Sequence, residues 1–600
     1  MVRKFEIYIL IFAISVPFFS FYRFSPAPDW FTNAGVIFFV SVFIVAAALK
    51  RGLMRWSVSP GGLLLLVGGV FWVLRAQYFD AAYMALILFL LMIIFFCIRS
   101  YDLKEIVNGV AVVVLICAMI QSFLGGLQAA DVAKYFDGYV VFDSARSVMG
   151  NVAQRNQYAN FLGWGLISVS YLYAHRSLNI GISIALAVFF ALMMCWSGSR
   201  LALLYGLVVV CLAWLWLKTS MDSEVMRRMA LALSLAVFLL AIIQIFNNEI
   251  LSALKEIGLD FQAVSGSDRI LDGDVGARRK IEWTKAWDVF IEHPWIGVGV
   301  GGFAAQSVAM EVASGLPKAP ESWLFAHCHN LLFQMLAEVG ILGAGIIFFG
   351  GGVTIGAYCK RCNRTIENFF LLSIAVIVLI HSVFEYPLWY LPFLFMLGMV
   401  GALAPEKRVF MLNVRSSVVR CMGFFGGVMG VLYCVVGIPN FWMLVRYNFP
   451  TSDVKENIVR IDRLSELAEN PLWASSADMV LSNYLLPTKE QLNFKLAHFE
   501  RLASYQPYPS VLTQLSILRA LDDQPDSAKK TLYKVVANYP ESVPKLAEIL
   551  SLRTEPEIKP LREIAIRAAQ AYAQHPPHSQ AAQLAAVMTV AAPVTRKPLF

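Results

Sequence analysis

The sequence predicts an all-α fold: a polytopic membrane protein of about thirteen transmembrane helices, followed by a helical C-terminal domain outside the membrane. Three observations support this prediction. Of the 600 residues, 58% are apolar and only 15% are charged, whereas soluble globular proteins have about half and about a quarter. Long apolar runs recur through the first 440 residues. Beyond them the chain becomes polar, with apolar residues at the spacing of an amphipathic helix.

Thirteen apolar segments are long enough to cross a hydrocarbon core of about 30 Å, which takes an α-helix of roughly 20 residues. The first follows Met1-Val2-Arg3-Lys4 without a small-residue cleavage site, so it is interpreted as a retained span. The predicted segments are 5–21, 31–49, 60–77, 82–98, 106–127, 156–174, 180–196, 201–217, 229–246, 331–358, 369–384, 388–403 and 421–439. They divide the chain into helices 1–9 (1–246), a large loop (247–330), helices 10–13 (331–440) and a C-terminal domain (441–600).

The basic residues predict the orientation of these segments. With the N-terminus in the cytoplasm, eighteen Lys and Arg residues fall in inner loops and six in short outer loops. The positive-inside rule then places the large loop and the C-terminal domain outside the cytoplasm. Lysine-rich inner loops fit a bacterial inner membrane, with the periplasm on the outer side. Because topology accounts for the net charge of +8, nucleic acid is not expected as a partner.

The C-terminal domain contains prolines at a regular spacing. Pro471, Pro507, Pro540 and Pro576 are separated by 36, 33 and 36 residues. A period near 34 residues, with proline closing the second helix, is typical of a tetratricopeptide-like array. Unrelated helices that happen to end in proline are the alternative. Either arrangement is a soluble domain suited to holding a partner protein.

Polar residues near the predicted outer ends of the spans are candidates for a binding site, because a charge at membrane depth needs a partner or a task. Guanidinium groups match phosphate oxygens in a bidentate geometry, so several arginines on one side suggest a site for a phosphorylated lipid. A headgroup anchor or a helix cap is the alternative for each arginine except Arg200, whose tight turn leaves it little freedom to extend away from the outer surface. The candidates are Arg75 after the third span, Gln154, Arg155 and Asn156 at the start of the sixth, Arg200 after the turn Ser197-Gly198-Ser199, and Arg278 and Arg279 in the large loop.

Two histidines lie where the large loop meets the tenth span. His327 and His329 flank Cys328. A histidine, with an ordinary pKa near 6.5, can act as a general base toward a hydroxyl nucleophile; a capping or core role is the alternative for His329. No carboxylate at a suitable spacing completes a His-Cys-His metal site, so no metal is expected. Glu338 and Glu385 are expected to support the shape of the pocket.

Five motifs together resemble the bacterial O-antigen ligase and polymerase superfamily, in particular the PglL-type O-oligosaccharyltransferases. The resemblance covers most of the chain, including the C-terminal domain, and the motifs follow the family's order. They are Gly150-Asn151-Val152-Ala153-Gln154-Arg155-Asn156, Ser199-Arg200, Arg279-Lys280-Ile281-Glu282-Trp283, His327-Cys328-His329-Asn330 and His381-Ser382-Val383-Phe384-Glu385-Tyr386-Pro387-Leu388-Trp389-Tyr390.

The resemblance implies a GT-C-like membrane fold and transfer of a preassembled glycan from undecaprenyl diphosphate to Ser or Thr of a periplasmic protein such as pilin. It implies that His329 is the essential histidine and that Arg200 and Arg279 contact the diphosphate, with Arg278 as the competing choice. Arg75 is a further candidate cation. An inverting reaction is expected, without metal or other cofactor. Residues expected to support the pocket are Gln154, Arg155, Asn156, His327, Glu338 and Glu385.

Three other functions remain open at this point. The same pocket would serve a sugar hydroxyl in ligation to lipid A–core or in glycan polymerisation, although the helical C-terminal domain favours a protein acceptor. A lipid-linked-sugar flippase or other transporter is the alternative from another class. The single large outer loop, the polar motifs on one face and the lack of visible inverted repeats argue against a transporter.

Overall fold

The computed structural model describes residues 2–50, 57–76, 78, 80–143, 147–220, 223–261, 277–313, 316, 323–407, 409–411, 416–575 and 580–591. Within these ranges the helices are joined by turns and loops, and the only strands are one short antiparallel pair, β1 (Ser57–Val58) with β2 (Phe410–Met411). The predicted all-α fold is therefore confirmed. The chain forms two compact units: Met1–Gly69, Leu86–Gly273 and Ile346–Pro439 make the first, and Val70–Ala85, Asp274–Gly345 and Asn440–Phe600 make the second.

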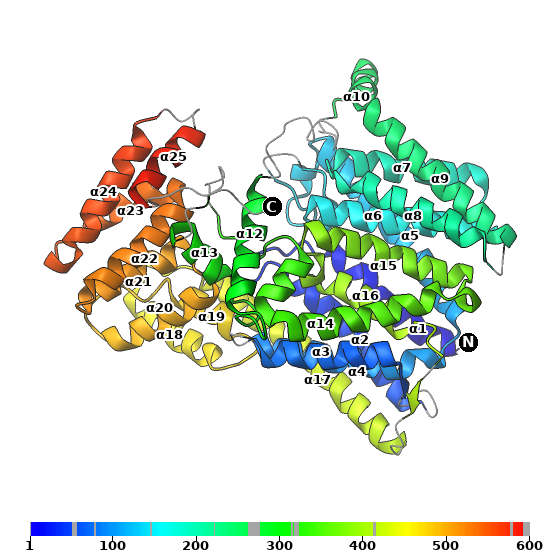
Figure 1. Ribbon diagram of the computed structural model, residues 1–600, viewed down its shortest axis with the longest axis horizontal. Helices are drawn as coiled ribbons and strands as arrows, with labels where there is room; N and C mark the ends of the chain where they lie inside the picture. The colour runs from blue at the N-terminus through cyan, green and yellow to red at the C-terminus, as the bar shows by residue number, and fades with distance from the viewer. Residues whose placement is uncertain are drawn as a thin grey trace. The chain divides into compact units, whose positions relative to one another are not determined.

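The first unit contains most of the apolar helices, among them the cyan helices of Figure 1. Four further helices, α3 (Pro60–Leu74), α4 (Asp80–Cys97), α14 (Leu331–Cys359) and α17 (Ser416–Arg446), contribute residues to both units. The helices of the first unit alone are α1 (Val2–Ser15), α2 (Trp30–Leu49), α5 (Leu103–Ala129), α6 (Arg155–Ala174), α7 (Ile180–Trp196), α8 (Leu201–Leu217), α9 (Ser223–Ile245), α10 (Asn247–Glu256), α15 (Ile366–Phe384) and α16 (Leu391–Ala402).

Capping residues in the sequence mark where several of these helices begin. The Asp102 carboxylate accepts the backbone N–H of Glu105 at 3.0 Å before α5. The Asn179 amide oxygen accepts the N–H of Ile182 at 2.8 Å before α7. Each cap satisfies a backbone donor that has no partner inside its own helix.

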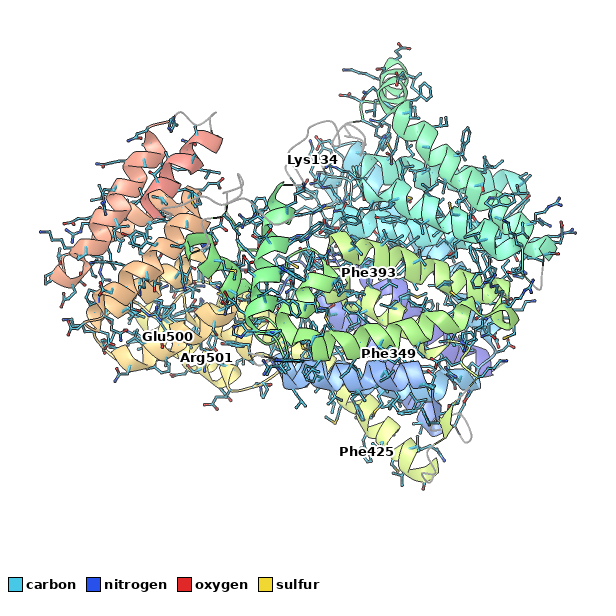
Figure 2. All side chains as sticks on the ribbon, viewed as in Figure 1. Lys134, Phe349, Phe393, Phe425, Glu500 and Arg501 are labelled. Carbon is cyan, nitrogen blue, oxygen red and sulfur yellow. The ribbon has the colours of Figure 1, made fainter. Side chains whose placement is uncertain are left out.

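A helix occupies each of the thirteen segments that the sequence predicts as spans. Among the described helices, seven are long and apolar enough to cross a membrane by length and composition. Phe349 on α14 and Phe425 on α17, both labelled in Figure 2, are 67% and 65% exposed, as expected of rings that face lipid. The chain is a multi-pass membrane protein, and the number thirteen stays a prediction. The seven are Trp30–Leu49, Ala82–Ser100, Leu103–Ala129, Ser223–Ile245, Leu331–Cys359, Ile366–Phe384 and Ser417–Arg446.

The second unit combines two loop helices with the C-terminal helices. Pro471, Pro507 and Pro540 each follow the end of a helix, as the periodicity predicts: α18 (Val454–Ala468), α20 (Leu492–Tyr505) and α22 (Pro525–Asn538). Pro576 lies outside the described residues. The tetratricopeptide-like assignment stays a prediction. The helices are α12 (Ala277–Glu292), α13 (Phe303–Ala313), α18 (Val454–Ala468), α19 (Ala474–Leu481), α20 (Leu492–Tyr505), α21 (Pro509–Leu521), α22 (Pro525–Asn538), α23 (Val543–Ser551), α24 (Lys559–Ala573) and α25 (Gln580–Ala591).

The core of the C-terminal helices includes one helix of the large loop. Val308 of α13 is 3% exposed and belongs to the same buried cluster as Leu532 and Val536 of α22. The Asn538 side-chain amide donates a hydrogen bond of 2.9 Å to the Val308 carbonyl. The large loop and the C-terminal helices therefore share one hydrophobic core.

A polar cluster adds a second connection within this unit. The hydroxyl of Tyr78, between α3 and α4, donates to the Asp478 carboxylate on α19, and the Tyr78 ring stacks on Tyr505 of α20 at 5.1 Å. Arg501 of α20, labelled in Figure 2, pairs with Asp478 at 2.8 Å. Burial, and then the hydrogen bond to Asp478, raises the pKa of Tyr78, so its hydroxyl stays protonated as a donor.

Candidate active site

The predicted site residues fall into one group in each unit. The first group lies at the start of α6. Gln154 caps this helix, since its side-chain oxygen accepts the N–H of Gln157 at 2.6 Å. Asn156 donates a hydrogen bond of 3.0 Å to the carboxylate of Glu385, the residue that ends α15. The structure thus brings together two predicted pocket residues that are 229 positions apart in the sequence.

The chain that leads into α6 is held by two buried glutamines that the sequence analysis did not select. The Gln128 side-chain oxygen accepts the N–H groups of Met149 and Gly150, both at 2.8 Å. The Gln121 oxygen accepts the N–H of Asn151 at 2.9 Å. These bonds satisfy an irregular buried stretch of backbone, in which Gly150 has a φ of +53°. Their signal in the sequence was a pair of amide side chains seven residues apart, and so on the same face of α5, within an apolar span.

His381 forms a further contact beside this group. Its Nδ1 lies 2.7 Å from the side-chain amide nitrogen of Asn160 on α6. Both residues are fully buried. Because an amide N–H₂ can only donate, Nδ1 is the acceptor and the proton of the neutral ring lies on Nε2. Asn160 thereby links α6 to α15 just below the contact between Asn156 and Glu385.

Arg200 follows a tight turn between α7 and α8. The Ser197 hydroxyl donates to the Met194 carbonyl at 2.7 Å and accepts the N–H of Ser199 at 3.3 Å. Gly198 has a φ of +67°, a conformation that favours glycine. Arg200 itself is half-buried and immediately precedes α8, so the turn fixes the backbone position from which its side chain extends.

In the second unit, a buried network of charges joins α12 to α13. Arg278 binds Glu282 at 2.7 Å and Glu311 at 3.1 Å, and Lys285 binds Glu282 at 2.9 Å and also contacts Glu311. Burial alone would raise the pKa of Glu282, but the charges of Lys285 and Arg278 outweigh it and hold that pKa below its ordinary value. Two positive and two negative charges balance each other. The positive charge of Arg278 is thus neutralised by carboxylates within the protein.

Arg279 occupies a different face of α12. It is half-buried, whereas the preceding Arg278 is 5% exposed. Successive residues of a helix point about 100° apart, so the two guanidinium groups do not share surroundings. The geometry separates two arginines that the sequence alone left as competing candidates.

His329 is held in a strained backbone conformation at the end of the large loop. Its φ is +59°, which is uncommon for a residue other than glycine. Its ring Nδ1 lies 3.0 Å from the carbonyl oxygen of His327. A carbonyl oxygen can only accept, so Nδ1 carries a proton, and in the neutral ring Nε2 has the lone pair.

His327 and Cys328 differ from His329 in their surroundings. Burial lowers the pKa of His327 to about 3, and the charge of His329 acts in the same direction. Cys328 is fully buried, and its N–H donates to the side chain of Gln334 at 2.8 Å. Among the described residues, no group of three or more His, Cys, Asp and Glu side chains has the arrangement of a metal site.

Helix α14 is broken at Gly340, two residues after Glu338, and a loop packs against the break. Gly340 has a φ of +63° and a ψ of −172°. The carbonyls of Ala337 and Glu338 accept the N–H groups of Val298 and Gly299, both at 2.9 Å. The Glu338 carboxylate also accepts the N–H of Gly301 at 2.9 Å. Irregular backbone in a membrane segment requires such partners, so Glu338 supports the loop that precedes the site.

Arg75 is bound to the same loop. Its guanidinium donates to the Gly297 carbonyl at 3.1 Å, and its backbone carbonyl accepts the N–H of Val300 at 2.8 Å. A Cβ on Gly297 would lie 2.3 Å from the backbone of Glu338, so the close approach needs glycine. Sequence analysis missed this contact between Arg75 and the loop, although the run Gly297-Val298-Gly299-Val300-Gly301 was a visible signal of close packing.

Comparison with known proteins finds three family matches along the chain. Residues 185–348 match the O-antigen ligase family, residues 369–551 the C-terminal region of virulence factor membrane-bound polymerases, and residues 148–173 protein glycosylation ligases. A general O-oligosaccharyltransferase of Acinetobacter baylyi (strain ATCC 33305 / BD413 / ADP1) is 23% identical over 433 residues, which cover 69% of this chain and 70% of that protein. No solved structure matches the chain. The resemblance to O-antigen ligases and PglL-type enzymes is confirmed.

The matches include most of the candidate site. The O-antigen ligase match contains Arg200, Arg279 and His329, and the glycosylation ligase match contains residues 154–156. Glu385 lies in the polymerase match. Arg75 lies outside all three matches. Its guanidinium donates a hydrogen bond to a loop of the protein itself.

Proposed function

We propose, from the similarity of the chain to O-antigen ligases and protein glycosylation ligases, that this protein is an O-linked oligosaccharyltransferase. Its donor is a preassembled glycan on undecaprenyl diphosphate, and its acceptor is a Ser or Thr hydroxyl of a periplasmic protein such as pilin. The chain lies in a bacterial inner membrane, with the large loop and the C-terminal helices in the periplasm. The named oligosaccharyltransferase relative and the glycosylation ligase match support this proposal.

The observation that carries the chemistry is the tautomer of His329. With Nδ1 donating to the His327 carbonyl, Nε2 is the nitrogen of the neutral ring that carries the lone pair and can take up a proton. The bond persists when the ring becomes protonated, because Nδ1 keeps its hydrogen. His329 is therefore suited to act as the general base, and His327 fixes its ring orientation through the backbone.

In the proposed reaction, the acceptor oxygen attacks the anomeric carbon of the first sugar from the side opposite the diphosphate. The new C–O bond forms as the bond from that carbon to the diphosphate oxygen breaks, and His329 Nε2 takes the hydroxyl proton. The configuration at the anomeric carbon inverts. The leaving diphosphate gains negative charge, which nearby cations stabilise more in the transition state than in the ground state.

Arg200 and Arg279 are the proposed ligands of the diphosphate. Arg278 is the weaker choice, because Glu282 and Glu311 already neutralise it. We assign Arg75 to loop positioning, since it binds the Gly297 carbonyl. Asn156 and Glu385 support the pocket from α6 and α15 through their mutual hydrogen bond.

A protein acceptor is favoured over a glycolipid by the C-terminal helices, which add a large polar surface to the large loop. Ligation to lipid A–core and glycan polymerisation remain the rivals, the second because residues 369–551 match a polymerase family. Purified protein in nanodiscs should be given lipid-linked glycan with a pilin, with lipid A–core or with glycan alone. We expect the pilin to be glycosylated. Transfer only to lipid A–core, or chain growth only, would overturn the protein acceptor; donor movement across liposomes without transfer would indicate a flippase.

A further inference from the structure

We propose that Trp323 is a stacking platform for the sugars of the donor glycan next to His329. This inference rests on the proposed transfer function and adds a glycan-binding residue to it. The starting observation is an exposed aromatic ring beside the candidate base. Trp323 is 60% exposed, in a segment of the large loop that leads directly to His329.

The Trp323 ring has a fixed support. It stacks on Phe325, with ring centroids 5.9 Å apart and planes 29° apart. Phe325 is 9% exposed. The guanidinium of Arg278, on α12, lies 4.4 Å from the centroid of the Phe325 ring. Because Arg278 is itself bound by Glu282 and Glu311, the stack ends in a buried network of ion pairs. An aromatic ring on such a base is preorganised for a ligand.

The stack also fixes where a ligand on Trp323 would lie. The Phe325 ring is 5.8 Å from the His329 ring, with planes 60° apart. Trp323 and His329 thus contact the same phenylalanine. Phe325 separates the Trp323 ring from the His329 ring, with centroid distances of 5.9 Å and 5.8 Å. A glycan whose first sugar is at His329 would therefore place its next sugars within reach of the exposed indole.

The chemistry of the indole suits this ligand. The face of an aromatic ring carries partial negative charge, and the apolar face of a pyranose presents C–H groups with partial positive charge. Binding sites combine such apolar walls with a few polar groups that orient the ligand. Stacking tolerates different hydroxyl patterns, so one tryptophan can serve glycans of varied composition.

Two other exposed tryptophans in the described part of the chain provide comparisons. Trp214 of α8 is 41% exposed and donates its indole N–H to Ser234 at 3.0 Å. Trp295 is 67% exposed and lies in the loop that fills the break of α14, where its carbonyl accepts the N–H of Leu342 at 3.2 Å. Trp295 is the matched control, since its exposure is similar to that of Trp323 but it is not one of the rings stacked beside His329. Anchoring in the membrane interface is the rival role for Trp323 and for Trp295.

The test compares Trp323→Ala, Trp323→Tyr and Trp295→Ala in nanodiscs. The readouts are KM and kcat for the lipid-linked glycan, and quenching of tryptophan fluorescence by the free oligosaccharide released from that donor. We expect Trp323→Ala to raise KM about tenfold with kcat changed less than about threefold, and to lose the quenching. Trp323→Tyr should restore most of the affinity, and Trp295→Ala should change KM less than twofold.

Equal KM values for Trp323→Ala and the wild type would overturn the inference, as would equal effects of Trp323→Ala and Trp295→Ala. Loss of activity in Trp323→Ala with no rescue by tyrosine and a lowered Tm would assign the ring a structural role instead. Failure of the proposed function is a separate outcome, because the wild-type protein would then show no transfer from the donor at all.

Discussion

Arg278 on α12 and Glu311 on α13 form a buried ion pair of 3.1 Å between two helices of the large loop. The pair joins Glu282 and Lys285 in a balanced network. A network of this kind fixes the position of α12, because separating the two helices would expose or isolate buried charges. The same helix carries Arg279, the proposed diphosphate ligand.

The first prediction separates these two arginines. Arg278→Ala leaves two buried carboxylates with one lysine and should destabilise the protein by about 3–5 kcal/mol. Arg279→Ala should leave Tm nearly unchanged but weaken both donor binding and transfer, since a charge-assisted hydrogen bond contributes about 1.5–3 kcal/mol. Arg279→Lys should recover only part, because a point charge cannot bind in a bidentate manner. Thermal unfolding and single-turnover transfer measure both effects; a stable but inactive Arg278→Ala with an active Arg279→Ala would reverse the assignment.

The second prediction concerns the C-terminal helices. Val308 lies in their core and accepts a hydrogen bond from Asn538, so a chain ending near residue 445 leaves α13 without its packing partners. We expect the truncated protein to keep the helix content of its membrane part and to lose transfer to folded and to peptide acceptors alike. Asn538→Ala should destabilise the full chain by about 1–3 kcal/mol. Circular dichroism measures the helix content, and transfer assays measure the activity. Undiminished transfer by the truncated chain would contradict this account.

The third prediction tests the break in α14. A Cβ on Gly340 would lie 2.4 Å from the Trp295 carbonyl carbon, and the residue has positive φ, so Gly340→Ala should lower Tm and abolish transfer. Gly345→Ala on the same helix is the matched control, because no atom beyond its chain neighbours and the adjacent backbone of its own helix lies within 4 Å of its added Cβ. It should be neutral or stabilising by up to about 1 kcal/mol. Equal effects of the two substitutions in thermal unfolding would argue against the interlocked loop.

The fourth prediction follows from His327. Its pKa of about 3 lies below the ordinary value of 6.5, so the unfolded chain binds more protons between these pH values. The stability that neutral His327 contributes is complete above pH 6.5 and is lost progressively as pH falls toward 3. His327→Gln should reduce the slope of Tm against pH in this window. It should leave the acid limb of the pH–rate profile in place, and loss of that limb would assign the titration to His327.

The sequence allowed the helices to be located because long apolar runs, bounded by polar residues, are typical of membrane helices. It also allowed Asn156 and Glu385 to be selected for one pocket, since both lie at helix ends beside apolar segments. Their hydrogen bond of 3.0 Å then appears in the structure. These features depend on local composition, which a single sequence contains.

Other features depend on partners far along the chain. Arg278 has a local partner in Glu282, four residues on, but its second partner, Glu311, lies 33 positions away and could not be identified from the sequence. The positive φ of Gly340 has its reason in the backbone of Trp295. Val308 looks like any apolar residue of a short helix until the C-terminal core surrounds it. Such long-range complementarity has no periodic signal in the sequence.

Single-turnover transfer by His329→Ala, measured beside donor binding, tests the central claim most directly. General-base catalysis contributes about 10² to 10⁴-fold, so the substitution should nearly abolish transfer while donor binding stays close to wild type. His327→Ala is the internal control and should be milder, and EDTA should have no effect on the wild type. An active His329→Ala beside an inactive His327→Ala, or a reaction stopped by EDTA and restored by a divalent ion, would contradict the account.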